Sequence, residues 1–234
     1  IGQALAYFDA RQYSYEIVVA ADGDDGTREI VAELAKTDPS LRVLGSVERR
    51  GKGHGIRQAV AIARGQIIGF ADADNKTPIE ELDRVLPLLR EGADVVIGSR
   101  RIDGARIERR QPLYRRTGSR AFAAFMHLIV GLPDLVDTQC GFKFFRGPVA
   151  IDLFARSRID GYMFDVEILF LARRAGYSIA QVPVRWRDDG DSRLQLFSGN
   201  LRNGRDLLMI RLWHRRASSA RPTSGTEREL RVDE

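Results

Sequence analysis

Short apolar runs alternate with longer amphipathic segments through the first hundred residues, and this alternation is the strongest constraint on the fold. The apolar runs have strand length and occupy residues 16–21, 41–47, 66–71 and 94–98. Helical spacing of apolar residues marks residues 2–13, 27–36, 53–64 and a segment that starts at Pro78. We expect Thr27 to cap the second helix and Gly65 to close the third. The alternation predicts parallel β-α-β units and an α/β fold.

Polar residues follow three of these strands directly. They are Asp22, the pair Asp72 and Asp74, and the pair Ser99 and Arg100. In an open parallel sheet, ligands bind at the carboxyl ends of the strands. We therefore expect these side chains to meet at one edge of the sheet and to form the functional site.

The second half of the chain has a less regular pattern. Residues 101–112 read as a polar, arginine-rich loop, and residues 217–234 read as a polar tail that we expect to be disordered. Between them we expect helices at 113–130, 164–175 and 199–213 and strands at 141–146 and 178–186. Pro183 has no backbone donor, so the last strand should lie at an edge or a bulge.

The net charge of +5 is concentrated in two segments. Residues 99–120 hold eight Arg against Asp103 and Glu108, and residues 200–216 hold five Arg against Asp206. Such local basicity favours an anionic partner at one surface. The sequence contains no basic stretch interleaved with aromatic residues and no reader motif, which argues against a nucleic-acid-binding protein.

Cysteine content and hydropathy bear on the compartment. A single cysteine, Cys140, cannot form an internal disulfide, which favours a reducing environment. The longest apolar run, 121–132, has 12 residues, whereas a membrane span needs roughly 20 residues. We expect a cytoplasmic protein without a membrane-spanning helix.

Asp72 and Asp74 place two carboxylates one residue apart, directly after an apolar strand. Mg²⁺ and Mn²⁺ prefer oxygen ligands, and such an ion is commonly held by one or two carboxylates together with substrate phosphates. The spacing therefore indicates a site for a divalent metal and a diphosphate. The alternative is a turn, or a cap for the helix that starts near Pro78.

Two further segments favour contact with a nucleotide. Asp22 stands at a strand end, where its carboxylate can accept hydrogen bonds from a base or ribose, and the glycines beside it let a ligand approach. Residues 49–53 offer Lys52 and flexible backbone before a helix N-terminus, a favourable place for phosphate. An ordinary turn is the alternative for both segments. The glycines match neither the dinucleotide fingerprint nor a Walker loop.

Six short motifs, in this order, resemble those of glycosyltransferase family 2, which has the GT-A fold. They are DGT (25–27), RGKG (50–53), FADAD (70–74), IGSR (97–100), DTQCGFK (137–143) and FDVE (164–167). Over residues 16–213 the chain looks most similar to the dolichyl-phosphate glucosyltransferases and mannose synthases of that family, including bacterial polyprenyl-phosphate relatives. The resemblance implies a Rossmann-like, mainly parallel sheet flanked by helices. It also implies one domain over residues 1–216, with a nucleotide-sugar half (1–100) and an acceptor half (101–216).

The resemblance implies roles for individual residues. The nucleotide sugar would be bound by Asp22, Lys52, Asp72 and Asp74, and the metal by Asp72 and Asp74. The acceptor phosphate would be bound by Arg100, Arg116 and Ser119. Asp74, as the more direct metal ligand, and Arg100 are the catalytic candidates.

Three features depart from the usual pattern of the family. Ala21 replaces one of two adjacent Asp residues after a nucleotide-binding strand. Lys76 stands where mannose synthases carry a third metal ligand, which favours the glucosyltransferases or a weaker metal site. The family's opening strand does not occur after Ile1, so we expect a further segment before it.

The implied reaction is the inverting transfer of a sugar from a UDP-glucose-like donor to a polyprenyl or dolichyl phosphate, with Mg²⁺ or Mn²⁺. Such an enzyme would work at the inner face of the membrane, docked peripherally through the basic helix at 199–216; the alternative is that this helix packs on the core and its arginines are solvated. A sugar hydroxyl acceptor is also possible and would need a base, for which Asp165 and Glu167 are candidates, although both could be structural. The remaining alternatives are a basic nucleic-acid-binding protein and a nucleotidyltransferase.

Overall fold

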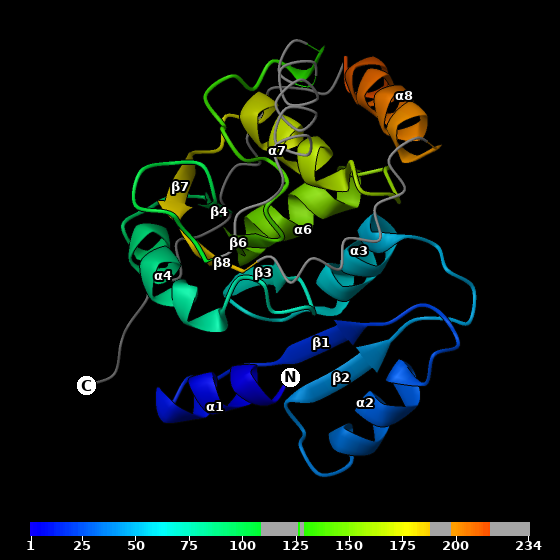
Figure 1. Cartoon of the computed structure of the whole chain (residues 1–234), viewed down its shortest axis with the longest axis vertical. Coiled ribbons are helices and arrows are strands. Elements are labelled where there is room, and N and C mark those ends of the chain that lie inside the picture. Colours follow the sequence, from blue (N-terminus) through cyan, green and yellow to red (C-terminus); the bar gives the residue numbers. More distant parts are fainter. Residues whose placement is uncertain (109–125, 127–128, 188–197, 216–234) are drawn as a thin grey trace.

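The computed structural model of the chain describes residues 1–108, 126, 129–187 and 198–215. Its first half confirms the predicted alternation of strands and helices (Figure 1). The strands are β1 (Ile17–Ala20), β2 (Leu41–Leu44), β3 (Ile67–Ala71) and β4 (Val95–Ser99). The helices are α1 (Gly2–Ala10), α2 (Thr27–Ala35), α3 (Lys52–Ile62) and α4 (Leu82–Arg90), with a short 3-10 helix, η1 (Ile79–Glu81), between Pro78 and α4.

The second half adds strands that complete the central sheet and helices that pack on it. Its strands are β5 (Arg106–Ile107), β6 (Phe142–Arg146), β7 (Ile179–Pro183) and β8 (Arg185–Trp186). Its helices are α6 (Gly147–Arg156), α7 (Phe164–Arg174) and α8 (Ser198–Trp213). The sequence analysis did not predict α6 or β5. Most of the helix predicted at 113–130 and all of the tail predicted at 217–234 lie outside the described residues.

The central sheet has the strand order β3-β6-β4-β7, and β1 and β2 form a separate parallel pair. β6 runs antiparallel to both β3 and β4, so these two strands point in the same direction although they are not adjacent. Ala71 pairs with Phe142, and Ile97 pairs with Lys143. The residues that follow β3 and β4 therefore lie on either side of the residues that precede β6. β7 is an edge strand, as Pro183 predicts, and β8 begins after it.

Helices cover both faces of β4, which explains its continuous apolar sequence. Val95 and Ile97 belong to a hydrophobic cluster formed with α6 and α7. Val96 belongs to a second cluster, formed with α1 and α4. Successive side chains of a strand point to opposite faces, so a strand with two covered faces needs apolar residues at every position.

Two predicted helix caps are wrong. Gly26, at φ 81°, is the N-cap of α2, and Thr27 is the first helical residue. The left-handed backbone of that turn suits glycine, while Asp25 accepts a hydrogen bond from the Thr27 amide at 3.1 Å. The end of α3 is capped at Ala63 in an extended conformation, so Gly65 does not close it.

Candidate active site

Asp72 and Asp74 lie in a tight turn directly after β3. The Asp72 amide donates to the Gly141 carbonyl at 2.9 Å, and the amide of Asn75, at φ 53°, donates to the Asp72 carbonyl at 3.2 Å. The two side chains are 39% and 46% exposed. Neither carboxylate caps η1 or α4. The alternative of a helix cap is therefore wrong, and the turn presents both carboxylates to solvent at the sheet edge.

Gly141 is the residue that permits the position of the Asp72 side chain. A Cβ atom at Gly141 would lie 2.1 Å from Asp72 Oδ2 and 2.2 Å from its Cγ. Any other residue would thus collide with the carboxylate. The sequence analysis placed Gly141 only at the start of a strand, because the approach of Asp72 depends on how β6 pairs with β3.

A lysine neutralises each carboxylate of the turn. Lys52, in the first turn of α3, places its Nζ 2.5 Å from Asp72 Oδ1, and Lys76 places its Nζ 3.0 Å from Asp74 Oδ2. Burial alone would lower the pKa of the Lys52 ammonium, but Asp165 and Asp72 hold that pKa above its usual value. Lys52 is therefore a permanent cation placed between two carboxylates.

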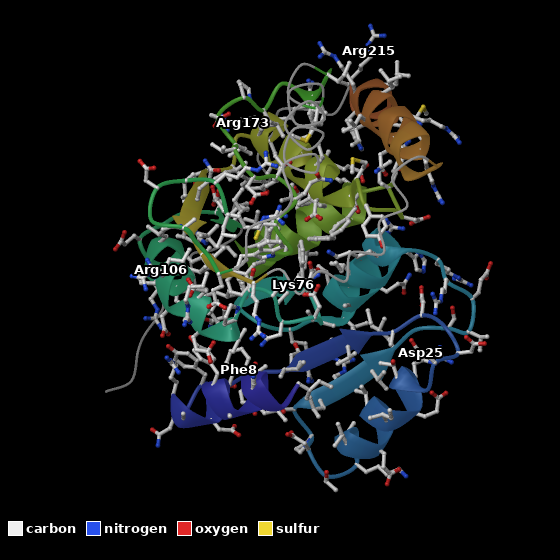
Figure 2. All side chains as sticks on the ribbon, viewed as in Figure 1. Phe8, Asp25, Lys76, Arg106, Arg173 and Arg215 are labelled. Carbon is white, nitrogen blue, oxygen red and sulfur yellow. The ribbon has the colours of Figure 1, made fainter. Side chains whose placement is uncertain are left out.

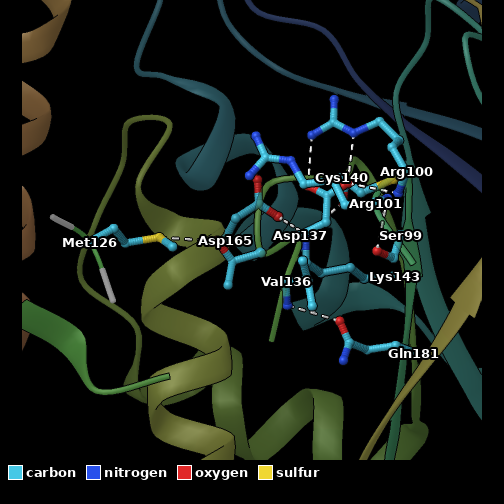
Figure 3. Close-up of polar contacts among 11 residues, drawn as sticks. Ser99, Arg100, Arg101, Met126, Val136, Asp137, Cys140, Lys143, Asp165 and Gln181 are labelled. Atoms are coloured by element: carbon cyan, nitrogen blue, oxygen red, sulfur yellow. Dashed lines mark hydrogen bonds and ion pairs between the residues drawn. The ribbon is translucent and has the colours of Figure 1, made fainter. Parts of the chain in front are cut away.

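A buried ion pair joins Lys143 and Asp165, both drawn in Figure 3. Asp165 lies close enough to Lys52 and Asp72 for their charges to act on it. Lys143 Nζ lies 2.5 Å from Asp165 Oδ1 and 2.6 Å from the Cys140 carbonyl, and neither charged side chain is more than 5% exposed. Burial raises the pKa of Asp165, although Lys143 and Lys52 oppose the shift. Lys143 thus joins the start of β6 to the start of α7 through Asp165, and this contact forms the floor of the candidate site near Asp72.

Glu167 is also used for structure. Its carboxylate accepts hydrogen bonds from the amides of Arg158 and Ile159, at 2.8–3.0 Å, and lies 2.7 Å from Nε2 of His214. Glu167 is fully buried, and His214 is 5% exposed. Asp165 and Glu167, the two base candidates, are therefore both engaged by partners inside the protein.

Asp22 stabilises the loop at residues 46–50, which precedes Lys52, by accepting hydrogen bonds from its backbone. Its Oδ1 accepts a hydrogen bond from the Ser46 amide and its Oδ2 from the Arg50 amide, both at 3.1 Å. The amides of Gly53 and His54, at the start of α3, donate to the Asp160 carbonyl at 2.8 and 3.3 Å. These helix amides are thus occupied by the protein itself, and Lys52 is the member of this segment that reaches the carboxylate turn.

Arg100 follows β4 and forms a two-pronged pair with Asp137 (Figure 3). Its Nε and Nη2 each lie 2.7 Å from a carboxylate oxygen of Asp137, and its amide donates to the same group at 2.9 Å. Burial would raise the pKa of Asp137, but the hydrogen bonds from Arg100 hold it below its usual value. The guanidinium also lies over the Trp186 ring, 5.3 Å from its centroid.

Comparisons with known proteins identify the family to which this chain belongs. The family model described as Glycosyl transferase family 2 matches residues 3–154. This chain belongs to glycosyltransferase family 2. The dolichyl-phosphate beta-glucosyltransferase of Trichomonas vaginalis is 33% identical over 92% of this chain and 66% of its own length. The human protein of that name is 33% identical over 90% of this chain and 69% of its own length. The chain thus spans about two thirds of the length of these relatives.

A solved structure supports the predicted fold of this family 2 protein. Glucosyl-3-phosphoglycerate synthase from Mycobacterium tuberculosis, in complex with Mn²⁺, UDP and glucosyl-3-phosphoglycerate, matches with a TM-score of 0.57. The match is 21% identical and covers 84% of this chain and 67% of that one. Such structural neighbours are GT-A glycosyltransferases, so the family 2 chain has the GT-A fold that the motifs predict.

The predicted site residues of this family 2 chain are brought together only in part. Lys52, Asp72 and Asp74 meet at the carboxylate turn, and Asp22 holds the segment that leads to Lys52. Arg100 lies after β4, on the other side of β6, and is paired with Asp137. The predicted acceptor residues Arg116 and Ser119 lie outside the described residues. In the part of the chain that is described, no helix combines the length and apolar character needed to cross a membrane.

Proposed function

We propose that this chain catalyses the inverting transfer of glucose from UDP-glucose to a polyprenyl phosphate of the dolichyl type. The observation that carries this proposal is that two relatives, each 33% identical over at least 90% of this chain, are named dolichyl-phosphate beta-glucosyltransferases. Residues 1–100 would bind the donor and residues 101–216 the acceptor, within one catalytic domain.

The Asp72 and Asp74 carboxylates fit a divalent metal ion that is shared with the donor. The described residues contain no group of three or more His, Cys, Asp or Glu side chains suited to a metal, so diphosphate oxygens would supply the remaining ligands, as is common for Mg²⁺. The absence of a side chain at Gly141 leaves space for the Asp72 carboxylate at this point. A bound Mg²⁺ or Mn²⁺ would offset the negative charge of the departing diphosphate.

Lys52 and Lys76 would take a second role when the donor arrives. Each neutralises one carboxylate of the turn, and a cation held by those carboxylates would compete with both ammonium groups. The released lysines would then bind the diphosphate oxygens and stabilise the leaving nucleoside diphosphate. Asp22 would contribute to the nucleotide side of the pocket through the loop that it holds.

The acceptor phosphate would act without a base from the protein. A phosphate monoester has a second pKa near 6, so at neutral pH it is mostly a dianion. One of its oxygens forms a bond to the anomeric carbon as the bond from that carbon to the UDP oxygen breaks, and UDP leaves with the electron pair. This route agrees with the engagement of Asp165 and Glu167 in buried contacts. Arg116 and Ser119 would orient the acceptor, because the planar guanidinium binds phosphate through two hydrogen bonds. Arg100, whose Nε and Nη2 are bonded to Asp137, would add its remaining N–H groups.

The acceptor lipid requires that the protein work at a membrane surface. We place the chain at the cytoplasmic inner face as a peripheral protein, held through the arginines and exposed leucines of α8. Basic residues near an anionic leaflet each contribute about 1 kcal/mol of attraction.

The test is to incubate the full chain with UDP-glucose, Mn²⁺ and a short-chain polyprenyl phosphate and to identify both products. We expect polyprenyl phosphate glucose and UDP, with GDP-mannose as the donor control and 3-phosphoglycerate as the hydroxyl-acceptor control. Release of pyrophosphate would identify a nucleotidyltransferase. Transfer only to the hydroxyl acceptor would also contradict the proposal.

A further inference from the structure

A hollow of about 430 Å³ lies away from the carboxylate turn, between α7, α8 and the segment before residue 133. Its walls carry Arg173, Arg174, Arg211 and Arg215, and its apolar lining includes Val130 and Leu132. Figure 2 shows Arg173 and Arg215 at the end of the molecule remote from β1 and β2. α7 begins at the buried Asp165 pair and ends at Arg174, so this hollow is about 14 Å along that helix from the floor of the active site.

Contacts within the protein hold three of the four arginine side chains of the hollow, and Arg215 is exposed. Arg173 pairs with Asp134, Arg174 donates to the Arg215 carbonyl at 3.3 Å, and Arg211 donates to the Ile129 carbonyl at 2.8 Å. A carbonyl is a neutral acceptor, so the bond of Arg211 orients its guanidinium without cancelling the charge. Arg211 therefore presents an oriented guanidinium group to the hollow, beside the exposed Arg215, and guanidinium groups suit a phosphate.

The side of α8 next to this hollow carries exposed leucines beside arginines. The spacing of one helix face is shared by Leu208, Arg211 and Leu212, and Arg215 follows two residues after the end of α8. Leu208 is 50% exposed and Leu212 is 56% exposed. Leu207, Ile210 and His214, on another face of the helix, are buried. One face of α8 thus packs against the core, and the adjacent face exposes leucines beside arginines to solvent.

We propose that the hollow binds the phosphate of an anionic phospholipid headgroup while Leu208 and Leu212 enter the lipid. This inference rests on the proposed function, which docks the chain at a membrane through α8, and adds a headgroup site beside that helix. A soluble phosphate would need the arginines but would gain nothing from two exposed leucines beside them. A phospholipid would contact both groups: its phosphate would bind the arginines and its acyl region would bury the leucines. Apolar insertion and electrostatic attraction act together at a membrane interface.

The test is co-sedimentation of the full chain with vesicles of phosphatidylcholine alone or mixed with phosphatidylglycerol, at low and high salt. We expect Arg211→Gln/Arg215→Gln to lower the partition coefficient on the anionic vesicles by clearly more than about 30-fold, the share that general attraction alone gives two basic residues near such a surface. The matched control is Arg202→Gln/Arg205→Gln, which removes the same charge from exposed positions of the same helix that do not line the hollow. We expect this control to lose no more than about 30-fold, the share that general attraction alone gives two basic residues.

A second variant tests the inference independently in case the arginine variant does not fold. Leu208→Ser/Leu212→Ser changes exposed side chains only, and we expect it to weaken binding to both kinds of vesicle with an unchanged melting temperature. Equal losses in the two arginine pairs would overturn the inference in favour of general attraction to charge. Binding of inorganic phosphate that depends on Arg211 and Arg215, with unchanged vesicle binding, would overturn it in favour of a soluble anion. The affinity for UDP with Mn²⁺, measured in parallel, tests the proposed function separately.

Discussion

The Lys52 ammonium lies 2.5 Å from the Asp72 carboxylate, and the two residues belong to the first turn of α3 and to the turn after β3. Asp165, buried at the start of α7, acts on the same ammonium from a third element. The ion pair therefore links three parts of the chain at the point where a donor-bound cation would enter. A cation bound at Asp72 would have to displace Lys52, so on the proposed function this lysine would compete with the metal in the absence of nucleotide.

We predict that Lys52→Gln has opposite effects on two affinities. Mn²⁺ alone should bind more tightly because its competitor is removed, whereas UDP with Mn²⁺ should bind about 10-fold more weakly because one charged hydrogen bond to the diphosphate is lost. Isothermal titration with Mn²⁺ and then with UDP measures both. Lys36→Gln, at a lysine that is paired with Glu33 on the surface of α2, is the control. Two affinities that change in the same direction would contradict the competition.

We predict that Asp74→Ala abolishes the dependence of UDP binding on Mn²⁺, because it removes the carboxylate that joins the cation to the diphosphate. The loss should be at least about 100-fold, since even outer-shell partners of a metal contribute 10–100-fold. Asp72→Asn should be milder. Titration of UDP with and without Mn²⁺ gives the result, and Asp103→Ala, at an exposed carboxylate, is the control. Metal-dependent binding that survives in Asp74→Ala would remove Asp74 from the site.

We predict that Gly141→Ala damages donor binding, because the added methyl group would overlap the Asp72 carboxylate at 2.1 Å. Either the carboxylate or the start of β6 must move, so the affinity for UDP with Mn²⁺ should fall by about 10-fold or more. Gly204→Ala, in α8, is the control because nothing lies within 4 Å of its Cβ position. An unchanged donor affinity in Gly141→Ala would show that the position of Asp72 does not matter for binding.

We predict that Arg100→Ala lowers the free energy of unfolding by about 3–5 kcal/mol at pH 7, because it leaves the buried charge of Asp137 without its partner. Asp137 has a lowered pKa in the folded state. Its contribution is therefore present above the unfolded value near 4 and is lost as the pH falls through the folded value. In Arg100→Ala, burial without the partner should raise the pKa of Asp137, so the deficit should shrink from pH 7 to pH 4. Urea unfolding at both pH values measures this; a deficit that does not change with pH would count against the buried pair.

We predict that Arg116→Ala raises the KM for polyprenyl phosphate about 10-fold, the loss of one charged hydrogen bond, with little change in the KM for UDP-glucose. The resemblance to family 2 places Arg116 near the acceptor phosphate. Arg100→Ala should share this effect in addition to its loss of stability. Steady-state kinetics with each substrate varied separately distinguish the two roles, and a rise confined to UDP-glucose would move these arginines to the leaving diphosphate.

The sequence by itself determined the elements whose signals are local. Short apolar runs of strand length and period-3.6 apolar spacing predicted β1 to β4 and the helices between them, and the polar residues after β3 and β4 indicated where the candidate site lies. Asp72 and Asp74 were predictable as a pair because their spacing and the strand before them are contained within a few residues. The edge position of β7 also followed from a single residue, Pro183, which cannot donate to a neighbouring strand.

Only the tertiary structure decided which groups meet across long separations. The insertion of β6 between β3 and β4 brings Gly141 against Asp72, and it places Arg100 beside Asp137, 37 residues later. An apolar pattern indicates that a strand is buried. It does not indicate which strand it pairs with, or whether the pairing is parallel or antiparallel, because every buried strand has the same pattern. The arginine hollow also could not be predicted from the sequence. Its lining residues come from segments that are distant in the sequence, and they become neighbours because α8 packs on α7.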